Sequence, residues 1–236
     1  MIKAVFLDWF HTLAKYEPPR EELQSQALGE SGIHLSPQQI LPGLMLADKG
    51  YFEENAISPI RERSPEEQAR IFFRYQQTIL TEAKVSPPLS PAILEKVMRR
   101  LRELHQGMSF ALFDDVLPSL KGLQERHLTL GLLTNLDMEM QSICRGLGLE
   151  PYLDFIVTSG EVGSDKPNPL IFLAALERAG VRAAEVVHVG DQYQIDVVGA
   201  RGVGITPVLI DRYNLNPDVS DCVRIASLSE LGQYLG

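Results

Sequence analysis

The sequence has few cysteines and no long apolar run, and each absence excludes a class of protein. Two cysteines, Cys144 and Cys222, occur among 236 residues. They are too few for the disulfide framework of a small secreted domain, and their spacing matches no zinc site. We therefore expect both thiols to be reduced and packed. No stretch approaches the roughly 18 consecutive apolar residues that a membrane-spanning helix needs.

Basic residues are also scarce relative to acidic ones. The chain has 22 Lys and Arg against 31 Asp and Glu, a formal net charge of −9. A nucleic-acid or anionic membrane surface needs clustered positive charge, so we expect neither partner. A small anionic substrate remains compatible, because one buried lysine or a metal ion sets the local potential of a site. The first apolar residues reach Asp8 too early to form a secretory signal, and we expect a cytoplasmic protein.

The first apolar run and the segment that follows it suggest two kinds of structure. Residues 4–7 are apolar and stop at Asp8, which favours a buried strand of a parallel sheet. Residues 17–107 instead have a helical pattern, in which Ser-Pro pairs begin helices at Ser36, Ser64 and Ser90. We predict an all-α insertion of four or five helices at 17–107.

Strand and helix patterns alternate after residue 108. Such alternation predicts a doubly wound parallel sheet, a Rossmann-like α/β core made of residues 1–16 and 108–236. Pro207 is expected near a sheet edge or a strand start, because proline cannot donate to the ladder. The expected strands are residues 128–134, 155–158, 185–189 and 206–210, and the expected helices are residues 138–147, 169–179, 195–201 and 227–235.

Polar side chains follow four of the apolar runs. Ligands of such a sheet bind at the carboxyl ends of its strands, so these residues are the candidates for a site. Their hydroxyl, amide and carboxylate groups suit a phosphate or a metal ion. Four runs that end this way are more than loop chemistry alone would produce. The residues are Asp8, Thr134-Asn135, Ser159 and Gly190-Asp191.

The first two candidates each have more than one interpretation. Asp8 fits a covalent nucleophile, a metal ligand or a helix cap. Beyond His11, Thr12 can offer its hydroxyl or backbone N–H to an anion at a helix start. Thr134 and Asn135 can hold a phosphoryl oxygen, or they can cap the helix that follows.

The later candidates are a lysine and two acidic residues. Prolines on both sides of Asn168 restrict the backbone near Lys166, which either neutralises a phosphate or is a solvated surface lysine. Asp191 and Asp196 can meet at one Mg²⁺ if the first ends a strand and the second lies in the next helical turn. Otherwise they cap a helix and occupy its exposed face. His188, flanked by valines, is expected to be a core residue with a satisfied ring.

Together these segments resemble the four motifs of the haloacid dehalogenase-like superfamily, in the same order and spacing. The helical insertion lies between the first and second motifs, where that family carries its cap domain. The resemblance covers nearly the whole chain, so it is more specific than any single motif. The motifs are residues 5–13 around Asp8, Leu132-Leu133-Thr134-Asn135, Lys166-Pro167, and Gly190-Asp191 with Asp196.

The resemblance implies a hydrolase that uses Mg²⁺ and acts on a small-molecule substrate, a phosphate ester. It assigns the reaction, the substrate phosphate and the metal to three overlapping sets of residues. These are Asp8, Thr134 and Lys166 for catalysis; His11, Thr12 and Asn135 for the phosphate; and Asp8, the backbone carbonyl of Phe10, Asp191 and Asp196 for the metal.

Phe10 departs from the pattern of the family's phosphatases. They carry at this position a second Asp that acts as general acid and base, a contribution worth about 10²–10⁴-fold. Phenylalanine cannot transfer a proton, so His11 or a residue of the cap would have to replace it. The carbonyl contact to Mg²⁺ does not depend on the side chain.

The family's haloacid dehalogenases carry an aromatic residue at the position of Phe10 and use no metal. They lack the Gly190-Asp191 pair that this chain retains, however, and Arg61, Arg63 and Arg74 do not match their arginine-rich signature. Three hypotheses follow: a Mg²⁺-dependent phosphatase, which we prefer, a metal-independent 2-haloacid dehalogenase, and a non-catalytic binding protein of the same fold.

Overall fold

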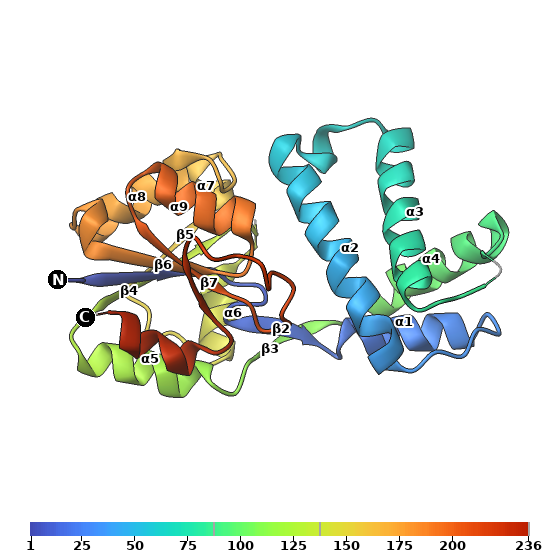
Figure 1. Cartoon of the computed structure of the whole chain (residues 1–236), viewed down its shortest axis with the longest axis horizontal. Helices are drawn as coiled ribbons and strands as arrows, with labels where there is room; N and C mark the ends of the chain where they lie inside the picture. Colours follow the sequence, from blue (N-terminus) through green and yellow to red (C-terminus); the bar gives the residue numbers. More distant parts are fainter. Residues whose placement is uncertain (87, 137, 236) are drawn as a thin grey trace. The chain divides into compact units, whose positions relative to one another are not determined.

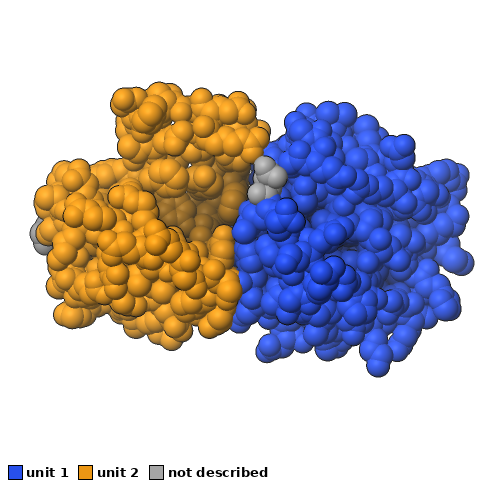
Figure 2. Space-filling model, turned by 180° about the vertical axis from the view of Figure 1, so that it is seen from behind, with its two compact units in different colours: residues 1–15, 110–236 blue, residues 16–109 orange. Residues whose placement is uncertain are grey.

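The computed structural model describes residues 1–86, 88–136 and 138–235. Its chain divides into two compact units, distinguished by colour in Figure 2. The first consists of Met1–Lys15 and Phe110–Gly236, and the second of Tyr16–Ser109. The roles of core and cap that the sequence suggests for these two parts stay predictions.

The first unit is built on a six-stranded sheet in which every pairing is parallel. The strand order is β5-β4-β1-β6-β7-β8, so successive strands extend the sheet outward on both sides of β1. This arrangement confirms the predicted doubly wound fold. The strands are β1 Ala4–Leu7, β4 Thr129–Thr134, β5 Phe155–Thr158, β6 Val186–Gly190, β7 Thr206–Ile210 and β8 Val223–Ile225.

Strand β1 lies at the centre of this sheet and is buried on both faces. Val5 and Leu7 join one apolar cluster, and Ala4 and Phe6 join a second one. Successive side chains of a strand point to opposite faces, so an uninterrupted apolar run suits a sheet covered by helices on both sides. The central position of β1 also places the residue after it, Asp8, in the middle of the carboxyl edge.

Helices cover both faces of the sheet (Figure 1). The helix α5, Val116–Glu125, lies on one face with α6, Met140–Gly146, and the final 3₁₀ helix, Leu228–Tyr234. On the other face are α8, Pro169–Ala179, and α9, Val198–Gly202. Two short helical turns, α7 Ser159–Val162 and a 3₁₀ turn at Ala183–Glu185, complete the unit.

The second unit is helical. The predicted starts after Ser36, Ser64 and Ser90 are present, and each serine side chain accepts a hydrogen bond from the backbone three residues later. Gln39 and Glu67 close the first two capping boxes. The helices are α1 Arg20–Gly29, α2 Pro37–Ile57, a 3₁₀ turn at Ile60–Glu62, α3 Pro65–Glu82 and α4 Pro91–His105.

Some elements differ from the sequence-based prediction. The unpredicted strands β2, Ala14–Glu17, and β3, Ser109–Leu112, form a separate two-stranded sheet. Neither segment is a continuous apolar run of four residues like the one that identified β1. The predicted helix 195–201 begins instead as a π-helix, Tyr193–Val197, before α9, and the predicted last helix is a 3₁₀ helix.

Three smaller expectations concern Pro207, the cysteines and membrane spans. Pro207 is the second residue of β7, before pairing with β8 begins at Val208, as expected for a strand start. Cys144 is buried, Cys222 is half-buried, and neither forms a disulfide. Within the described ranges, every helix is too short or too polar to cross a bilayer.

Two glycines of α2 provide a matched test of packing inside the helical unit. A methyl group at Gly43 would lie 2.8 Å from the Cα and the carbonyl oxygen of Ile79 on α3, whereas one at Gly50 would meet nothing within 4 Å. We expect Gly43→Ala to lower the free energy of unfolding by about 1–3 kcal/mol, because backbone atoms have to move. Gly50→Ala should raise it by up to about 1 kcal/mol. Urea unfolding followed by circular dichroism measures both changes, and equal effects would contradict the packing.

Candidate active site

Asp8 lies at the carboxyl end of β1, between the ends of two neighbouring strands. In the register of the sheet, Leu7 is paired with Leu132 of β4 and with Val189 of β6. The backbone N–H of Asp8 donates to the carbonyl of Val189 at 2.9 Å. Parallel strands therefore bring Asp8 close to the segments that follow β4 and β6, and its side chain is only slightly exposed.

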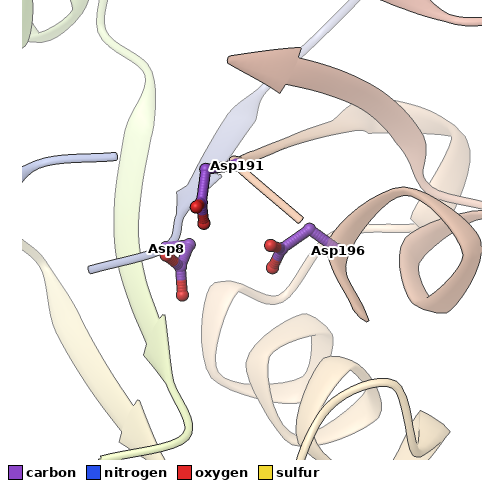
Figure 3. Close-up of side chains that lie close together, drawn as sticks. All are labelled: Asp8, Asp191 and Asp196. Carbon is purple, nitrogen blue, oxygen red and sulfur yellow. The ribbon is translucent and has the colours of Figure 1, made fainter. Parts of the chain in front are cut away.

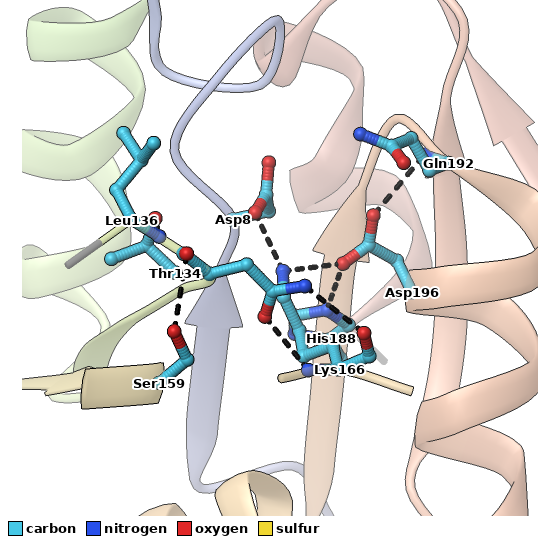
Figure 4. Close-up of polar contacts among 9 residues, drawn as sticks. Asp8, Thr134, Leu136, Ser159, Lys166, His188, Gln192 and Asp196 are labelled. Atoms are coloured by element: carbon cyan, nitrogen blue, oxygen red, sulfur yellow. Dashed lines mark hydrogen bonds and ion pairs between the residues drawn. The ribbon is translucent and has the colours of Figure 1, made fainter. Parts of the chain in front are cut away.

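Lys166 reaches this edge of the sheet from the loop before α8. Its Nζ lies 2.5 Å from Oδ1 of Asp8 and 2.6 Å from Oδ1 of Asp196 (Figure 4). The lysine side chain is 1% exposed, so it is not a solvated surface lysine. The structure thus joins three of the predicted site residues through one buried ammonium group.

Asn135 holds the backbone of Lys166 in place. Its Oδ1 accepts from the Lys166 N–H at 2.7 Å, and its Nδ2 donates to the Lys166 carbonyl at 3.0 Å. The carbonyl of Asn135 in turn accepts from the hydroxyl of Ser159 at 3.1 Å. Both ends of the amide are thus engaged in positioning the lysine, and phosphate binding by Asn135 stays a prediction.

Asp196 lies inside the π-helix that follows β6, and it is buried rather than on an exposed face. Its Oδ1 contacts Lys166, and its Oδ2 accepts from the backbone N–H of Gln192 at 3.1 Å. A methyl group at Gly190 would lie 2.2 Å from Cγ of Asp196. The absence of a side chain at Gly190 is therefore what lets the carboxylate approach the strand end so closely.

His188 is a site residue whose role sequence reasoning missed. It was expected in the core with a satisfied ring, and the ring is indeed fully buried. Its Nε2, however, lies 3.0 Å from Oδ1 of Asp196, the oxygen that also contacts Lys166. His188 and Gly190 are two residues apart on one strand and so face the same side. The sequence signal that could have indicated this role is the spacing itself, because it places the His188 ring on the same face of the strand as Gly190.

Three carboxylates form a group that can hold a metal ion. Asp8, Asp191 and Asp196 each offer an oxygen, and these atoms lie within 4.8 Å of one another (Figure 3). Oδ1 of Asp191 is buried and has no hydrogen-bond partner among the residues that the structure describes. Such an atom needs a donor or a cation, and a hard cation prefers carboxylate oxygens. The residues present therefore fit Mg²⁺.

The charges of the cluster are unequally compensated. Burial raises the pKa of Asp8 to about 6, against the effect of Lys166. Burial, together with Asp8 and Asp196, also raises the pKa of Asp191 well above its ordinary value. Burial acts in the same direction on Asp196, but the Lys166 ammonium and the hydrogen bond with His188 hold its pKa below the ordinary value. One ammonium thus faces three carboxylates, and a bound cation would favour the charged forms of Asp8 and Asp191.

Two further predicted residues, Thr134 and Thr12, carry hydroxyl groups. The hydroxyl of Thr134 accepts from the backbone N–H of Leu136 at 3.1 Å. This is a local turn bond and not a helix cap, because α6 begins only at Met140 and Glu139 precedes it. The hydroxyl of Thr12 is buried without a hydrogen-bond partner in the described parts of the chain. Their binding of phosphate stays a prediction.

Phe10 and His11 lie on the loop after Asp8. Their ring centroids are 4.0 Å apart, and the His11 ring also meets the ring of Tyr213 edge-on at 5.3 Å. The backbone N–H of His11 donates to the carbonyl of Ala14 at 2.8 Å. A metal contact through the Phe10 carbonyl and phosphate binding by His11 both stay predictions.

Comparison with known sequences gives a consistent picture. The family model for haloacid dehalogenase-like hydrolase matches residues 2–204. Haloacid dehalogenase-like hydrolase domain-containing protein 3 of Danio rerio is 31% identical over 213 residues, which are 89% of this chain and 86% of that protein. Phosphoserine phosphatase of Thermus thermophilus is 33% identical over 156 residues, 64% of this chain and 60% of that protein.

Solved structures with the same fold include both phosphatases and haloacid dehalogenases. A HAD phosphatase from Thermococcus onnurineus is 25% identical with a TM-score of 0.58, and the match covers 100% of this chain and 98% of that one. A 2-haloacid dehalogenase from Pseudomonas syringae is also 25% identical, with a TM-score of 0.57 and the same coverage. Overall similarity to these structures therefore does not separate a phosphatase from a dehalogenase.

Removal of the Lys166 charge should destabilise the metal-free protein in a pH-dependent way. In Lys166→Met, Asp8 and Asp196 lose the cation that lowers their pKa values in the folded chain. A carboxyl whose folded pKa lies above its unfolded value loses stabilisation as pH rises through that range. We expect a deficit of about 3–5 kcal/mol at pH 8 that shrinks towards pH 4.5.

Urea unfolding in the presence of a chelator measures this deficit at each pH. Lys121→Met on α5 is the matched control, because Lys121 is exposed and should change the free energy of unfolding by less than about 0.5 kcal/mol. A Lys166→Met deficit that is constant across pH, or larger at pH 4.5, would contradict the ion-pair geometry.

Proposed function

Because this chain belongs to the haloacid dehalogenase-like hydrolase family, and is therefore a hydrolase, we propose that it is a Mg²⁺-dependent phosphatase of small phosphate esters. The observation that carries the proposal is the buried Lys166, which bridges Asp8 and Asp196 beside the unpartnered oxygen of Asp191. A lysine and a cation-binding group around one carboxylate suit the attack of that carboxylate on a phosphate. The similarity to a phosphoserine phosphatase supports the same chemistry.

Asp8 is the proposed nucleophile. One of its carboxylate oxygens attacks phosphorus, an oxygen–phosphorus bond forms, and the bond from phosphorus to the alcohol oxygen of the substrate breaks. Water then attacks the aspartyl-phosphate, which releases inorganic phosphate and restores the carboxylate. Lys166 contacts Oδ1 of Asp8 at 2.5 Å, so it would hold the nucleophile in one orientation and offset the charge of the incoming phosphate.

Mg²⁺ would be held by Asp8 and Asp191, with the carbonyl of Phe10 as a further proposed ligand. When bound, the ion supplies charge neutralisation for the phosphoryl oxygens. Asp196 was expected to be a ligand as well. Because its oxygens already bind Lys166, His188 and the Gln192 N–H, we propose that it acts mainly by fixing the lysine.

The remaining roles are assigned by the same logic. Thr134 would donate its hydroxyl proton to a phosphoryl oxygen, and Thr12, whose hydroxyl is buried, would do the same from the loop after β1. His11 is the proposed replacement for the general acid that Phe10 cannot provide. The helical unit of residues 16–109 would serve as the cap and select the substrate.

A 2-haloacid dehalogenase is the second candidate, favoured by the aromatic side chain of Phe10 and by the 25% identity to a solved dehalogenase. In that reaction Asp8 would displace halide from carbon, and water would hydrolyse the ester. Retention of Asp191 in the carboxylate group favours the phosphatase. Chloride release from 2-chloropropionate in the presence of a chelator, without phosphate release, would select the dehalogenase.

Phosphate release from a panel of phosphate esters with Mg²⁺ tests the proposed function. Asp8→Asn removes the nucleophile but keeps its size, so we expect the rate to fall by at least about a thousandfold. Asp114→Asn is the control, because Asp114 is an exposed carboxylate of the same unit and should keep full activity. Phosphate release that persists in Asp8→Asn would rule out the aspartyl-phosphate. If the protein turned over neither the phosphate esters nor 2-chloropropionate, and Phe10→Asp gained phosphatase activity, the chain would be a binding protein that lost proton transfer.

A further inference from the structure

The helical unit contains a cavity of its own, and every residue that lines it belongs to residues 16–109. Its volume is about 320 Å³, near the lower end of the range for small-molecule sites. Figure 2 shows this unit hollowed on the face drawn. The cavity takes its walls from helices α1, α2, α3 and α4. Its principal lining residues are Arg20, Asp48, Tyr51, Phe72, Tyr75 and Arg102.

One part of the wall is aromatic. Tyr51 of α2 stacks on Phe72 of α3, with ring centroids 6.0 Å apart and planes at 29°, and it meets Tyr75 edge-on at 6.3 Å. Phe72 is 41% exposed, although aromatic residues are usually buried more completely. Such a surface suits the flat apolar body of a ligand.

A buried polar group forms another part of the wall. The guanidinium of Arg20 contacts both carboxylate oxygens of Asp48, and the hydroxyl of Tyr75 donates to Oδ1 of Asp48 at 2.6 Å. Buried ion pairs are often no more stabilising than apolar side chains of the same volume. The pair and the Tyr75 hydroxyl thus give the cavity one polar wall in which the two charges balance each other.

The lining carries an excess of positive charge. Asp48 balances Arg20, but Arg102 of α4 has no hydrogen bond or ion pair with any residue in the described ranges, and the cavity has no second carboxylate among its lining residues. The histidine of the lining, His105, has a pKa that burial and the nearby Arg20 hold below its ordinary value. Arg102 is exposed, and among the lining residues its guanidinium is the cation that no described carboxylate offsets.

We propose that this cavity is a binding site for a small aromatic monoanion, a flat apolar ring that carries one carboxylate or sulfonate group. The ring would lie against Tyr51 and Phe72, and the anionic group would pair with the Arg102 guanidinium. This proposal does not depend on the aspartate cluster of the first unit or on the proposed phosphatase reaction, so a test of one does not decide the other.

Titration of the full-length protein with two matched probes tests the site. Naphthalene-1-sulfonate carries the anion, and 1-naphthalenemethanol is a neutral molecule of similar shape. Amide resonances followed by NMR should show saturable one-to-one binding of the sulfonate, with shifts at residues 51, 72 and 102. We expect the sulfonate to bind about threefold to fivefold more tightly than the alcohol, as an exposed ion pair contributes.

Three variants test separately the charge of Arg102, the position of that charge in the cavity, and the aromatic wall. Arg102→Met should remove the preference for the sulfonate, whereas Arg99→Met, an exposed arginine of the same helix outside the cavity lining, should keep it. Phe72→Ala should weaken both probes to a similar degree. Circular dichroism establishes that each variant is folded.

Several outcomes would overturn the proposal. They are no saturable binding up to about 1 mM, a concentration at which even weak complexes are detected, and a preference for the sulfonate that survives in Arg102→Met. Displacement of the sulfonate by Mg²⁺ with inorganic phosphate would also overturn it, because the probe would then occupy the aspartate cluster.

Discussion

The Lys166 ammonium, held between the carboxylates of Asp8 and Asp196, is the interaction on which the rest of the site depends. A buried ion of either sign is costly unless it is paired and hydrogen-bonded. Here the lysine contacts one oxygen of each aspartate at 2.5 and 2.6 Å, so the three groups stabilise one another. Asp191 lies outside this arrangement, with an oxygen that lacks a partner among the described residues, and this uncompensated charge is what makes the cluster suited to a divalent cation.

The parallel sheet makes this interaction possible by bringing distant segments to one edge. Asp8 follows β1, and Asp191 follows β6, the strand paired with β1. Lys166 and Asp196 come from the segments around α8 and α9, and each is fixed by a further residue. Asn135 clamps the lysine backbone, and His188 binds the Asp196 carboxylate. Gly190 completes the arrangement, because any side chain there would displace Asp196.

Sequence reasoning predicted the parts of this structure that depend on local pattern. Apolar runs identified β1 and β4 to β7, and Ser-Pro pairs identified the starts of α2, α3 and α4, because burial and helix capping leave local sequence patterns. The polar strand ends pointed to Asp8 and Asp191, and the resemblance to the four family motifs added Lys166 and Asp196 to the same group. The predicted metal and phosphate contacts involve partners outside the chain and remain proposals.

What the sequence concealed depends on contacts between distant residues or on very short elements. The two hydrogen bonds between the Asn135 side chain and the Lys166 backbone join residues 31 positions apart, and no local pattern records them. The bond from His188 reaches Asp196 inside the π-helix at Tyr193–Val197, a local distortion that helical periodicity does not reveal. The cavity of the second unit likewise arises only when four helices pack together.

The most direct test of the central claim is a crystal structure determined with Mg²⁺ and beryllium trifluoride, a mimic of a phosphoryl group. The account predicts beryllium bonded to a carboxylate oxygen of Asp8, one of the fluorine atoms of the mimic near Lys166, and Mg²⁺ about 2.0–2.1 Å from oxygens of Asp8 and Asp191. A folded protein that binds the mimic elsewhere, or that binds Mg²⁺ without Asp8 and Asp191, would contradict it.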